Sequence, residues 1–125
     1  DNHISFLKKN GYSLSEIIKK ARSNAGFGLK IEIEVETFQD AVDSVKSGVD
    51  IVLLDNMELA EMEKTVTNLR TIGKNILIEA SGGINLNNVM NIAETGVDII
   101  SVGALTHSVI THDFSLISSF EDFAQ

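Results

Sequence analysis

Short apolar runs alternate along the chain with longer amphipathic segments. The runs are rich in Ile, Val and Leu, as buried strands are, and the amphipathic segments space their apolar residues as helices do. We therefore predict strands near 30–36, 50–55, 75–79 and 98–102. The predicted helices lie near 13–23, 38–47, 58–71, 86–94 and 113–123. This alternation predicts βα units and a parallel sheet.

A glycine separates several predicted helices from the strands that follow. The sequence Lys46-Ser47-Gly48-Val49-Asp50-Ile51-Val52 recurs as Glu94-Thr95-Gly96-Val97-Asp98-Ile99-Ile100, and Thr71-Ile72-Gly73-Lys74-Asn75-Ile76-Leu77 is a related junction between them. The three glycines are spaced by 25 and 23 residues. Glycine suits a helix end because the chain turns there through a left-handed conformation.

Polar residues mark the starts of three predicted helices. Ser13 with Glu16, and Thr37 with Asp40, have the spacing of capping boxes, and Asn85 is a plausible N-cap for the helix near 86–94. The pattern predicts the α/β class, with about four βα units and parallel strands in a partial (β/α) TIM-like barrel. A complete barrel takes about 250 residues, so a chain of 125 makes about half of one. An open doubly wound sheet is the alternative.

Composition narrows the classes of partner. The net charge of −8 and the pI near 4.7 disfavour nucleic acid and anionic membranes, and no apolar run approaches the roughly 18–20 residues of a transmembrane helix. The absence of Cys excludes disulfides and thiolate metal sites and is compatible with a reducing compartment. The location that we expect is the cytoplasm. The start at Asp1, without Met or a signal segment, leads us to expect a piece of a longer chain.

One predicted strand alternates strictly between aliphatic and acidic residues: Ile31-Glu32-Ile33-Glu34-Val35-Glu36. In a βα barrel the outer face lies under helices and must be apolar, so these acids point into the lumen. The acids nearest the strand's carboxyl end, Glu34 or Glu36, then reach the mouth where barrel enzymes hold their active sites. We expect Glu32, the deepest of the three, to be a core ion-pair partner.

Asp55 ends the next predicted strand, and it could face the same ligand as Glu34. Such acids can stabilise a developing positive charge, hold hydroxyls, or hold a metal attached to phosphate. The alternative is a lumen layer of carboxylates neutralised by Lys or Arg elsewhere in the barrel. We expect Glu79 to be structural.

Two glycine-bearing loops follow the last two predicted strands. Ser81-Gly82-Gly83-Ile84-Asn85 is expected to end a strand and open a helix, and Val102-Gly103-Ala104 offers a second set of amides. Either loop alone would be more typical of a structural turn, but together they favour a phosphate site. His107 either contacts this phosphate or caps the following segment. Neither Lys nor Arg follows Lys74, so the cations that a polyanionic ligand needs must come from elsewhere.

Successive motifs along nearly the whole chain resemble those of the quinolinate phosphoribosyltransferases, also called nicotinate-nucleotide pyrophosphorylases (carboxylating). The motifs are Asp1-Asn2-His3-Ile4, Glu32-Ile33-Glu34-Val35-Glu36, Ile51-Val52-Leu53-Leu54-Asp55-Asn56, Glu79-Ala80-Ser81-Gly82-Gly83-Ile84, Ala93-Glu94-Thr95-Gly96-Val97-Asp98 and Ser101-Val102-Gly103-Ala104-Leu105-Thr106-His107-Ser108. The resemblance implies that residues 1–125 are the C-terminal part of the enzyme's α/β barrel, without its N-terminal domain and first barrel strands.

The implied activity is that of a glycosyltransferase, specifically a pentosyltransferase of NAD biosynthesis. A phosphoribosyl group passes from phosphoribosyl pyrophosphate to quinolinate with decarboxylation, giving nicotinate mononucleotide, pyrophosphate and CO2. Mg²⁺ is the implied cofactor, held through the pyrophosphate near Glu34 and Asp55, with no firm protein ligand set. A homodimer or higher homo-oligomer is implied.

Carried over by motif, Glu34 and Asp55 line the ribose and stabilise an oxocarbenium-like transition state. The implied phosphate-binding residues are Ser81, Gly82, Gly83, Val102, Gly103 and Ala104, with His107 beside them.

The family's Lys before Asp-Asn-His and its quinolinate-binding basic residues lie upstream of Asp1. We therefore expect these 125 residues alone to be inactive and to expose two unpaired sheet edges. Two alternatives remain: a related pyrophosphorylase-like protein with another acceptor, such as those linked to molybdenum uptake, or a non-catalytic phosphate-binding half-barrel.

Overall fold

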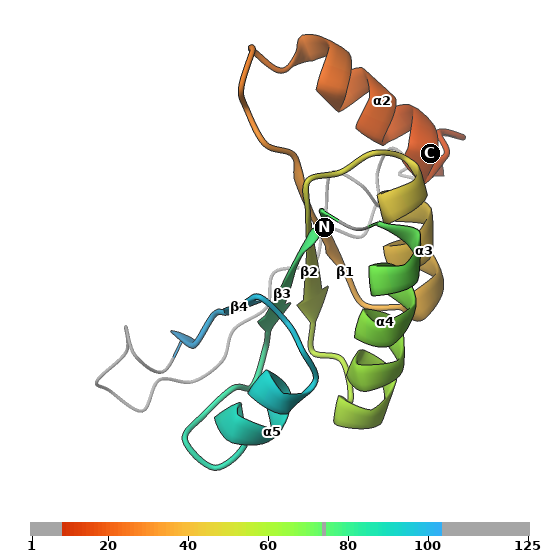
Figure 1. Cartoon of the computed structure of the whole chain (residues 1–125). Helices are drawn as coiled ribbons and strands as arrows, with labels where there is room; N and C mark the ends of the chain where they lie inside the picture. The colour runs from red at the N-terminus through yellow and green to blue at the C-terminus, as the bar shows by residue number, and fades with distance from the viewer. Residues whose placement is uncertain (1–8, 74, 104–125) are drawn as a thin grey trace, which may run out of the picture.

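Four parallel strands form one sheet in the computed structural model, which describes residues 9–73 and 75–103. The strands are β1 (Glu32–Val35), β2 (Ile51–Asp55), β3 (Leu77–Ser81) and β4 (Ile99–Ile100), and they lie side by side in chain order. The helices that alternate with them are α2 (Leu14–Asn24), α3 (Phe38–Lys46), α4 (Leu59–Ile72) and α5 (Val89–Glu94) (Figure 1). The predicted alternation is confirmed, and the predicted helix 113–123 lies outside the described residues.

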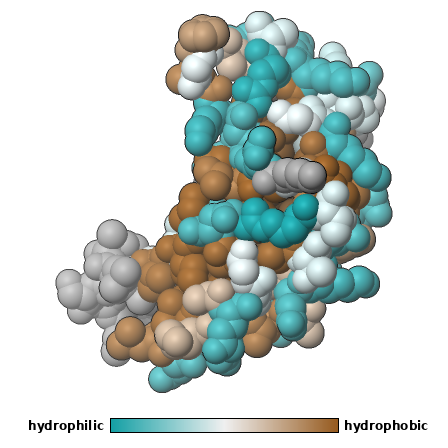
Figure 2. Space-filling model, viewed as in Figure 1, coloured by the Kyte–Doolittle hydropathy of each residue, from teal (hydrophilic) through white to brown (hydrophobic). Residues whose placement is uncertain are grey.

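The two faces of the sheet differ in their covering. Figure 1 shows α3 and α4 along one side of the strands. The residues that point to this side are aliphatic and at most 5% exposed: Ile33, Val35, Val52, Leu54, Ile78 and Ala80. On the opposite face, which we call the lumen face, Leu53 and Leu77 are only half-buried. Figure 2 shows hydrophobic surface in the region of the strands.

Strand order and one-sided covering together decide the architecture. A doubly wound sheet reverses its strand order and carries helices on both faces, whereas a barrel keeps the order and curls its bare face inward. The observed sheet matches a partial barrel, so this prediction is confirmed and the open doubly wound alternative is wrong. β1 and β4 are the outer strands of the described sheet.

Side chains cap the first two helices as predicted. At α2, Ser13 Oγ accepts a hydrogen bond from the Glu16 N–H at 3.3 Å, and the Ser13 N–H donates to Glu16 Oε2 at 2.8 Å. At α3, Thr37 Oγ1 accepts from the Asp40 N–H at 3.1 Å. These bonds satisfy N–H groups that the first turn of a helix leaves without partners.

The three junction glycines do not share one conformation. Gly48 and Gly96 have φ of 90° and 86°, so the predicted left-handed turn is confirmed there. Gly73 has φ of −127°, and the same prediction is wrong for it. A Cβ on Gly73 would lie 2.9 Å from Val45 Cγ1 of α3. Glycine is therefore needed at position 73 because two helices pack closely there, rather than for backbone handedness.

The glycine repeat also carries two matching ion-pair clusters at the amino ends of the strands. In the first clamp (Arg22, Gly48 and Asp50), the guanidinium donates to the Gly48 carbonyl at 2.9 Å and to Asp50 Oδ2 at 2.5 Å. The same oxygen accepts from the Ile31 N–H at 2.7 Å. The first clamp therefore joins the end of α2 to the starts of β1 and β2.

The second clamp (Arg70, Gly96 and Asp98) repeats this arrangement. Arg70 donates to the Gly96 carbonyl at 3.0 Å and to Asp98 Oδ2 at 2.7 Å, and that oxygen accepts from the Ile78 N–H at 2.7 Å. Sequence inspection identified the Gly and Asp members of both clamps but neither arginine.

Strand boundaries differ from the prediction at β3. This strand was expected at 75–79 and runs from Leu77 to Ser81, because its ladder begins where Leu77 pairs with Ile51 of β2. Glu79 therefore lies within the strand, and Ser81 is its last residue. Within the described ranges, none of the helices has the length and apolarity needed to cross a bilayer.

Candidate functional site

Two carboxylates lie on the lumen face near the carboxyl ends of neighbouring strands. Glu34 of β1 stands opposite Leu53 of β2, and Asp55 lies two residues further along β2 on the same face. Asp55 stands opposite Ser81 of β3. Three of the predicted site residues, Glu34, Asp55 and Ser81, are half-buried and lie at the carboxyl end of the sheet, which we call the rim.

Asn56, to which sequence reasoning assigned no role, links the ends of β2 and β3. Its Nδ2 donates to Asp55 Oδ2 at 2.8 Å, and its backbone N–H donates to the Ser81 carbonyl at 3.0 Å. Its φ of 49° is left-handed, a conformation that Asn adopts more readily than most residues. An Asn directly after a strand-end Asp was the available signal in the sequence. Asn56 therefore orients the carboxylate of Asp55 through Oδ2. The other carboxylate oxygen, Asp55 Oδ1, accepts no hydrogen bond from any described residue.

Gly82 packs directly against Asn56 in the loop after β3. A Cβ on Gly82 would lie 2.3 Å from Asn56 Oδ1 and 2.7 Å from the Asn56 backbone nitrogen, and its φ is 87°. A side chain at position 82 would therefore both collide with its neighbour and strain the backbone. Gly83 has φ of 61° and open space around its Cβ position. The first glycine loop (Ser81, Gly82 and Gly83) is thus shaped by the end of β2.

Two asparagines hold the far side of this loop. Asn85 Nδ2 and Asn88 Nδ2 both donate to the Gly83 carbonyl, at 3.2 and 3.1 Å. The Asn85 N–H in turn donates to Asn88 Oδ1 at 2.8 Å. Inside the described part of the chain, no group accepts a hydrogen bond from the N–H of Gly82 or Gly83. These two amides are therefore available to an anionic ligand.

Helix α5 begins later than predicted. We expected it near 86–94 with Asn85 as its N-cap, but it runs from Val89 to Glu94 and its N-cap is Asn88. Asn85 Oδ1 instead accepts from the Asn87 N–H at 2.9 Å. This local turn competes with the helix for the residues after Gly83. The first glycine loop consequently does not open directly into a helix, and an anion there would depend on loop amides.

The second glycine loop (Val102, Gly103 and Ala104) follows β4, the strand next to β3. Val102 is half-buried and Gly103 is exposed. Ala104 and His107, two further predicted phosphate-binding residues, lie outside the described residues. The Ser101 N–H donates to the Ala80 carbonyl at 2.9 Å, so the described part of this loop begins beside the end of β3.

Glu79 and Ser101 are joined on the lumen face below the two loops. The Ser101 hydroxyl donates to Glu79 Oε1, and the Glu79 residue is only 9% exposed. Glu32, by contrast, was expected to be a core ion-pair partner, but it is exposed and makes no ion pair within the described ranges. This expectation is wrong because β1 is an outer strand of the described sheet.

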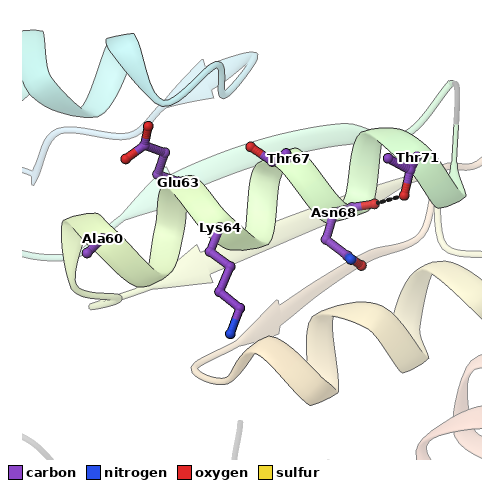
Figure 3. A pocket seen from close by; sticks show the side chains of 6 residues that line it. All are labelled: Ala60, Glu63, Lys64, Thr67, Asn68 and Thr71. Carbon is purple, nitrogen blue, oxygen red and sulfur yellow. Dashed lines mark hydrogen bonds between the residues drawn. The ribbon is translucent and has the colours of Figure 1, made fainter.

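Two hollows mark the surface near α4. One of about 270 Å³ lies beside the first glycine loop and is lined by Asn56, Met57, Glu58, Leu59, Met62, Gly82, Asn88, Asn91 and Ile92. Another, of about 470 Å³, is lined by α4 alone (Figure 3), through Ala60, Glu63, Lys64, Thr67, Asn68 and Thr71. The second hollow contains no strand-end residue, so we place the candidate site at the rim.

Charge is distributed unevenly over the sheet. The ionisable side chains on the lumen face are all acidic, and none of the four described strands contains Lys or Arg. No group of three or more His, Cys, Asp or Glu within the described residues could hold a metal ion. The rim therefore offers carboxylates and backbone amides, and any cation that binds a ligand phosphate must come from outside these strands.

The fold and rim together define a class: a partial β/α barrel with acids and glycine loops at the carboxyl ends of its strands. Residues 1–117 match the family described as quinolinate phosphoribosyl transferase, C-terminal domain. The chain belongs to this family.

Named relatives agree with this assignment. The chain is 37% identical over 116 residues to the nicotinate-nucleotide pyrophosphorylase (carboxylating) of Rattus norvegicus, covering 93% of this chain and 38% of that protein. It is 39% identical over 118 residues to a probable enzyme of the same name from Methanothermobacter thermautotrophicus, covering 93% and 41%. NadC from Streptococcus pyogenes aligns with a TM-score of 0.75 and 36% identity over 92% of this chain and 38% of that chain. The chain thus spans about two fifths of the length of these relatives.

Proposed function

We propose that this chain forms the phosphoribosyl-binding half of a quinolinate phosphoribosyltransferase, a pentosyltransferase of NAD biosynthesis. The whole enzyme would transfer the phosphoribosyl group of phosphoribosyl pyrophosphate to quinolinate, with loss of CO2 and release of pyrophosphate. One observation carries the proposal: parallel strands bring Glu34, Asp55 and the two glycine loops to a single rim. Family membership and relatives named as carboxylating pyrophosphorylases support the choice of reaction.

In this proposal Glu34 and Asp55 face the ribose. As pyrophosphate leaves, positive charge develops on the ribose ring, and two fixed carboxylates lower the free energy of that transition state. The hydrogen bond from Asn56 supports this role, because it fixes the orientation of Asp55 before the donor binds.

The two glycine loops would bind phosphate of the donor. The N–H groups of Gly82 and Gly83 have no acceptor among the described residues, which supports this assignment. The predicted set also includes Ser81, Val102, Gly103, Ala104 and His107. Backbone amides can approach an anion closely at glycine because no side chain intervenes.

Mg²⁺ is the proposed cofactor, bound chiefly through the pyrophosphate. Glu34 and Asp55 fit this arrangement, since Mg²⁺ commonly takes one or two carboxylates and completes its shell with phosphate oxygens and water. When bound, the ion would neutralise charge on the departing pyrophosphate.

The quinolinate carboxylates require cations that the described strands lack, so we propose that the acceptor pocket comes from the rest of the polypeptide and a partner subunit in a homodimer or higher homo-oligomer. A cytoplasmic location is part of the same proposal.

The test measures phosphoribosyl pyrophosphate consumption by the full-length protein, with and without quinolinate, and in Mg²⁺ or EDTA. We expect consumption only with both quinolinate and Mg²⁺, accompanied by nicotinate mononucleotide and CO2. Glu34→Gln should lower kcat/KM by about 100-fold, as the loss of one transition-state electrostatic contact does. Glu63→Gln, an exposed acid on α4, is the matched control and should keep wild-type activity.

Two outcomes would replace the proposal. Consumption of the donor with a different acceptor, and not with quinolinate, would identify the related pyrophosphorylase-like function. Binding of phosphoribosyl pyrophosphate without turnover of any acceptor would identify a non-catalytic phosphate-binding protein. The isolated 125-residue chain should be inactive in every case, and quinolinate turnover by it would contradict the proposed need for an outside acceptor pocket.

A further inference from the structure

The last described strand is held to the sheet by few backbone contacts. β4 has two residues, and its register with β3 contains two pairs, against four between β1 and β2 and five between β2 and β3. Two flanking bonds extend the contact, from the Asp98 N–H to the Ile78 carbonyl at 2.8 Å and from the Ser101 N–H to the Ala80 carbonyl at 2.9 Å. Because this backbone ladder is so short, side-chain hydrogen bonds between β3 and β4 contribute strongly to the position of β4.

Side-chain bonds join β4 to β3 at both ends. At the amino end, the carboxylate of Asp98 accepts from the Ile78 N–H within the second clamp. At the carboxyl end, the Ser101 hydroxyl donates to the carboxylate of Glu79. The amino-end contact has a counterpart in the first clamp, where Asp50 accepts from the Ile31 N–H. The carboxyl-end contact has no counterpart between β1 and β2 in the described structure.

Glu79 occupies a position where packing alone would favour an aliphatic residue. Its cross-strand neighbours on the lumen face are Leu53 and Ile99, and the residue is only 9% exposed. Removing a carboxylate from water is unfavourable unless hydrogen bonds compensate. Among the described residues, the side chain that donates a hydrogen bond to this carboxylate is Ser101.

This pair lies directly below both glycine loops. Glu79 precedes Ser81 by two residues on β3, and Ser101 immediately precedes Val102 at the start of the second loop. A phosphate held by both loops must lie within hydrogen-bond distance of amides from each, so the separation of β3 and β4 decides how well it fits. Of the side-chain hydrogen bonds that join these two strands in the described ranges, the one between Ser101 and Glu79 lies nearest the loops.

We propose that Glu79 and Ser101 are positioning residues that set the separation of the two glycine loops and thereby the binding of phosphoribosyl pyrophosphate. This inference rests on the proposed function. The pair acts through the loops, so its loss raises the KM for the phosphate-bearing donor. The KM for quinolinate stays unchanged, because its carboxylates need cations that neither the described strands nor the two loops provide.

Four variants of the full-length protein test the hydrogen bond separately from the charge. Ser101→Ala removes the donor at an exposed position, and Ser101→Thr keeps a hydroxyl on a residue suited to strands. Glu79→Gln keeps an acceptor oxygen but removes the charge, whereas Glu79→Leu removes both. Glu63→Gln on α4 serves as the control.

Ser101→Ala and Glu79→Leu should raise the KM for phosphoribosyl pyrophosphate about tenfold, with kcat and the KM for quinolinate within about twofold of wild type. Ser101→Thr should restore the wild-type KM, and Glu79→Gln should lie between wild type and Glu79→Leu. A merely structural role would lower the melting temperature and the active fraction, hence kcat, without moving one KM against the other.

A wild-type donor KM in Ser101→Ala would overturn the inference, as would equal increases in both KM values. If Glu79→Leu fails to fold, the comparison of Ser101→Ala with Ser101→Thr still decides the question. A wild-type protein that does not turn over quinolinate refutes the proposed function itself. A fully active wild type with unaffected Ser101 variants refutes only the positioning role.

Discussion

The two ends of the sheet use acidic residues in opposite ways. At the amino ends, Asp50 and Asp98 each accept hydrogen bonds from an arginine and a backbone N–H. At the carboxyl ends, Glu34 and Asp55 make no ion pair in the part of the chain that the structure describes. In each clamp an arginine neutralises the aspartate. The carboxylates at the rim have no such cation among the described residues and can therefore interact with a ligand.

This difference shows that the residue type does not assign a role. Asp50 directly precedes β2, and Asp55 is the last residue of β2, so the two side chains lie at opposite ends of the same strand. Barrel enzymes in general hold their active sites at the carboxyl ends of the strands and use the amino ends for stability. The predictions below test whether this chain divides its acids in the same way.

The largest effect should come from Asp55→Asn in the full-length protein. We expect kcat/KM to fall by about 100- to 1,000-fold, since one transition-state electrostatic contact is worth about 3–4 kcal/mol. The free energy of unfolding should change by less than about 0.5 kcal/mol because Asp55 has no ion-pair partner among the described residues. Steady-state kinetics and urea unfolding measure the two quantities. Asp98→Asn is the matched control, and equal losses of activity in both variants would contradict the division between rim and clamps.

Gly82→Ala should give the next largest effect. Its Cβ would lie 2.7 Å from the Asn56 backbone nitrogen, in a left-handed conformation, so we expect about 3 kcal/mol of destabilisation in urea unfolding. Gly83→Ala has open space and should lose only about 1 kcal/mol through its left-handed backbone. Equal losses in the two variants would show that the contact with Asn56 does not constrain the loop.

Breaking one clamp should cost less. Asp98→Asn keeps an acceptor oxygen but removes the charge that faces Arg70, and both side chains are about one third exposed. Solvent screens such a pair, so we expect a loss of about 1 kcal/mol in urea unfolding and unchanged KM values. Asp50→Asn should behave alike, since the first clamp has the same geometry. A selective rise in one KM would mean that a clamp also shapes the rim.

The smallest effect should appear in the pH dependence of stability. The Ile31 N–H and the Arg22 guanidinium lower the pKa of Asp50. Burial acts to raise the pKa of Asp98, but hydrogen bonds from Arg70 and the Ile78 N–H outweigh it and the pKa is lowered. Depressed folded-state pKa values stabilise the protein above the unfolded value of about 4, and this stability is lost as pH falls through the folded values.

The double variant Asp50→Asn/Asp98→Asn isolates this contribution. Urea midpoints between pH 7 and pH 2.5 should differ from wild type at neutral pH and converge as the medium becomes acidic. A constant difference across the range would show that the clamps do not titrate with the expected sign. Raising the ionic strength should shrink the neutral-pH difference, because these groups are partly exposed.

Much of the fold followed from local patterns. The alternation of Glu32 to Glu36 correctly assigned one face of β1 to the helices, because side chains on a strand alternate between faces. The capping residues Ser13 and Thr37 correctly marked two helix starts. Gly48 and Gly96 marked left-handed helix ends. Each of these signals depends on residues within a few positions of one another.

Contacts between distant segments were harder to predict. The spacing of Gly73 matched the other junctions, but its need for glycine comes from Val45 on another helix. Asn85 is a different case: it had the sequence of an N-cap, but a local turn with Asn87 competes with the helix and delays α5 to Val89. Arg22 and Arg70 carried no local signal because each bonds to an aspartate 28 residues away.

By itself, the sequence determined the order of the elements, the apolar face of each strand and the acids and glycines that end the strands, because these depend on periodicity and local backbone preference. The tertiary structure alone decided which partners those residues meet: Asn56 beside Asp55 and Gly82, Ser101 beside Glu79, and an arginine beside the aspartate of each clamp. Parallel strands bring residues together across βα connections of about two dozen positions, so each partnership depends on register and twist, which no local pattern encodes.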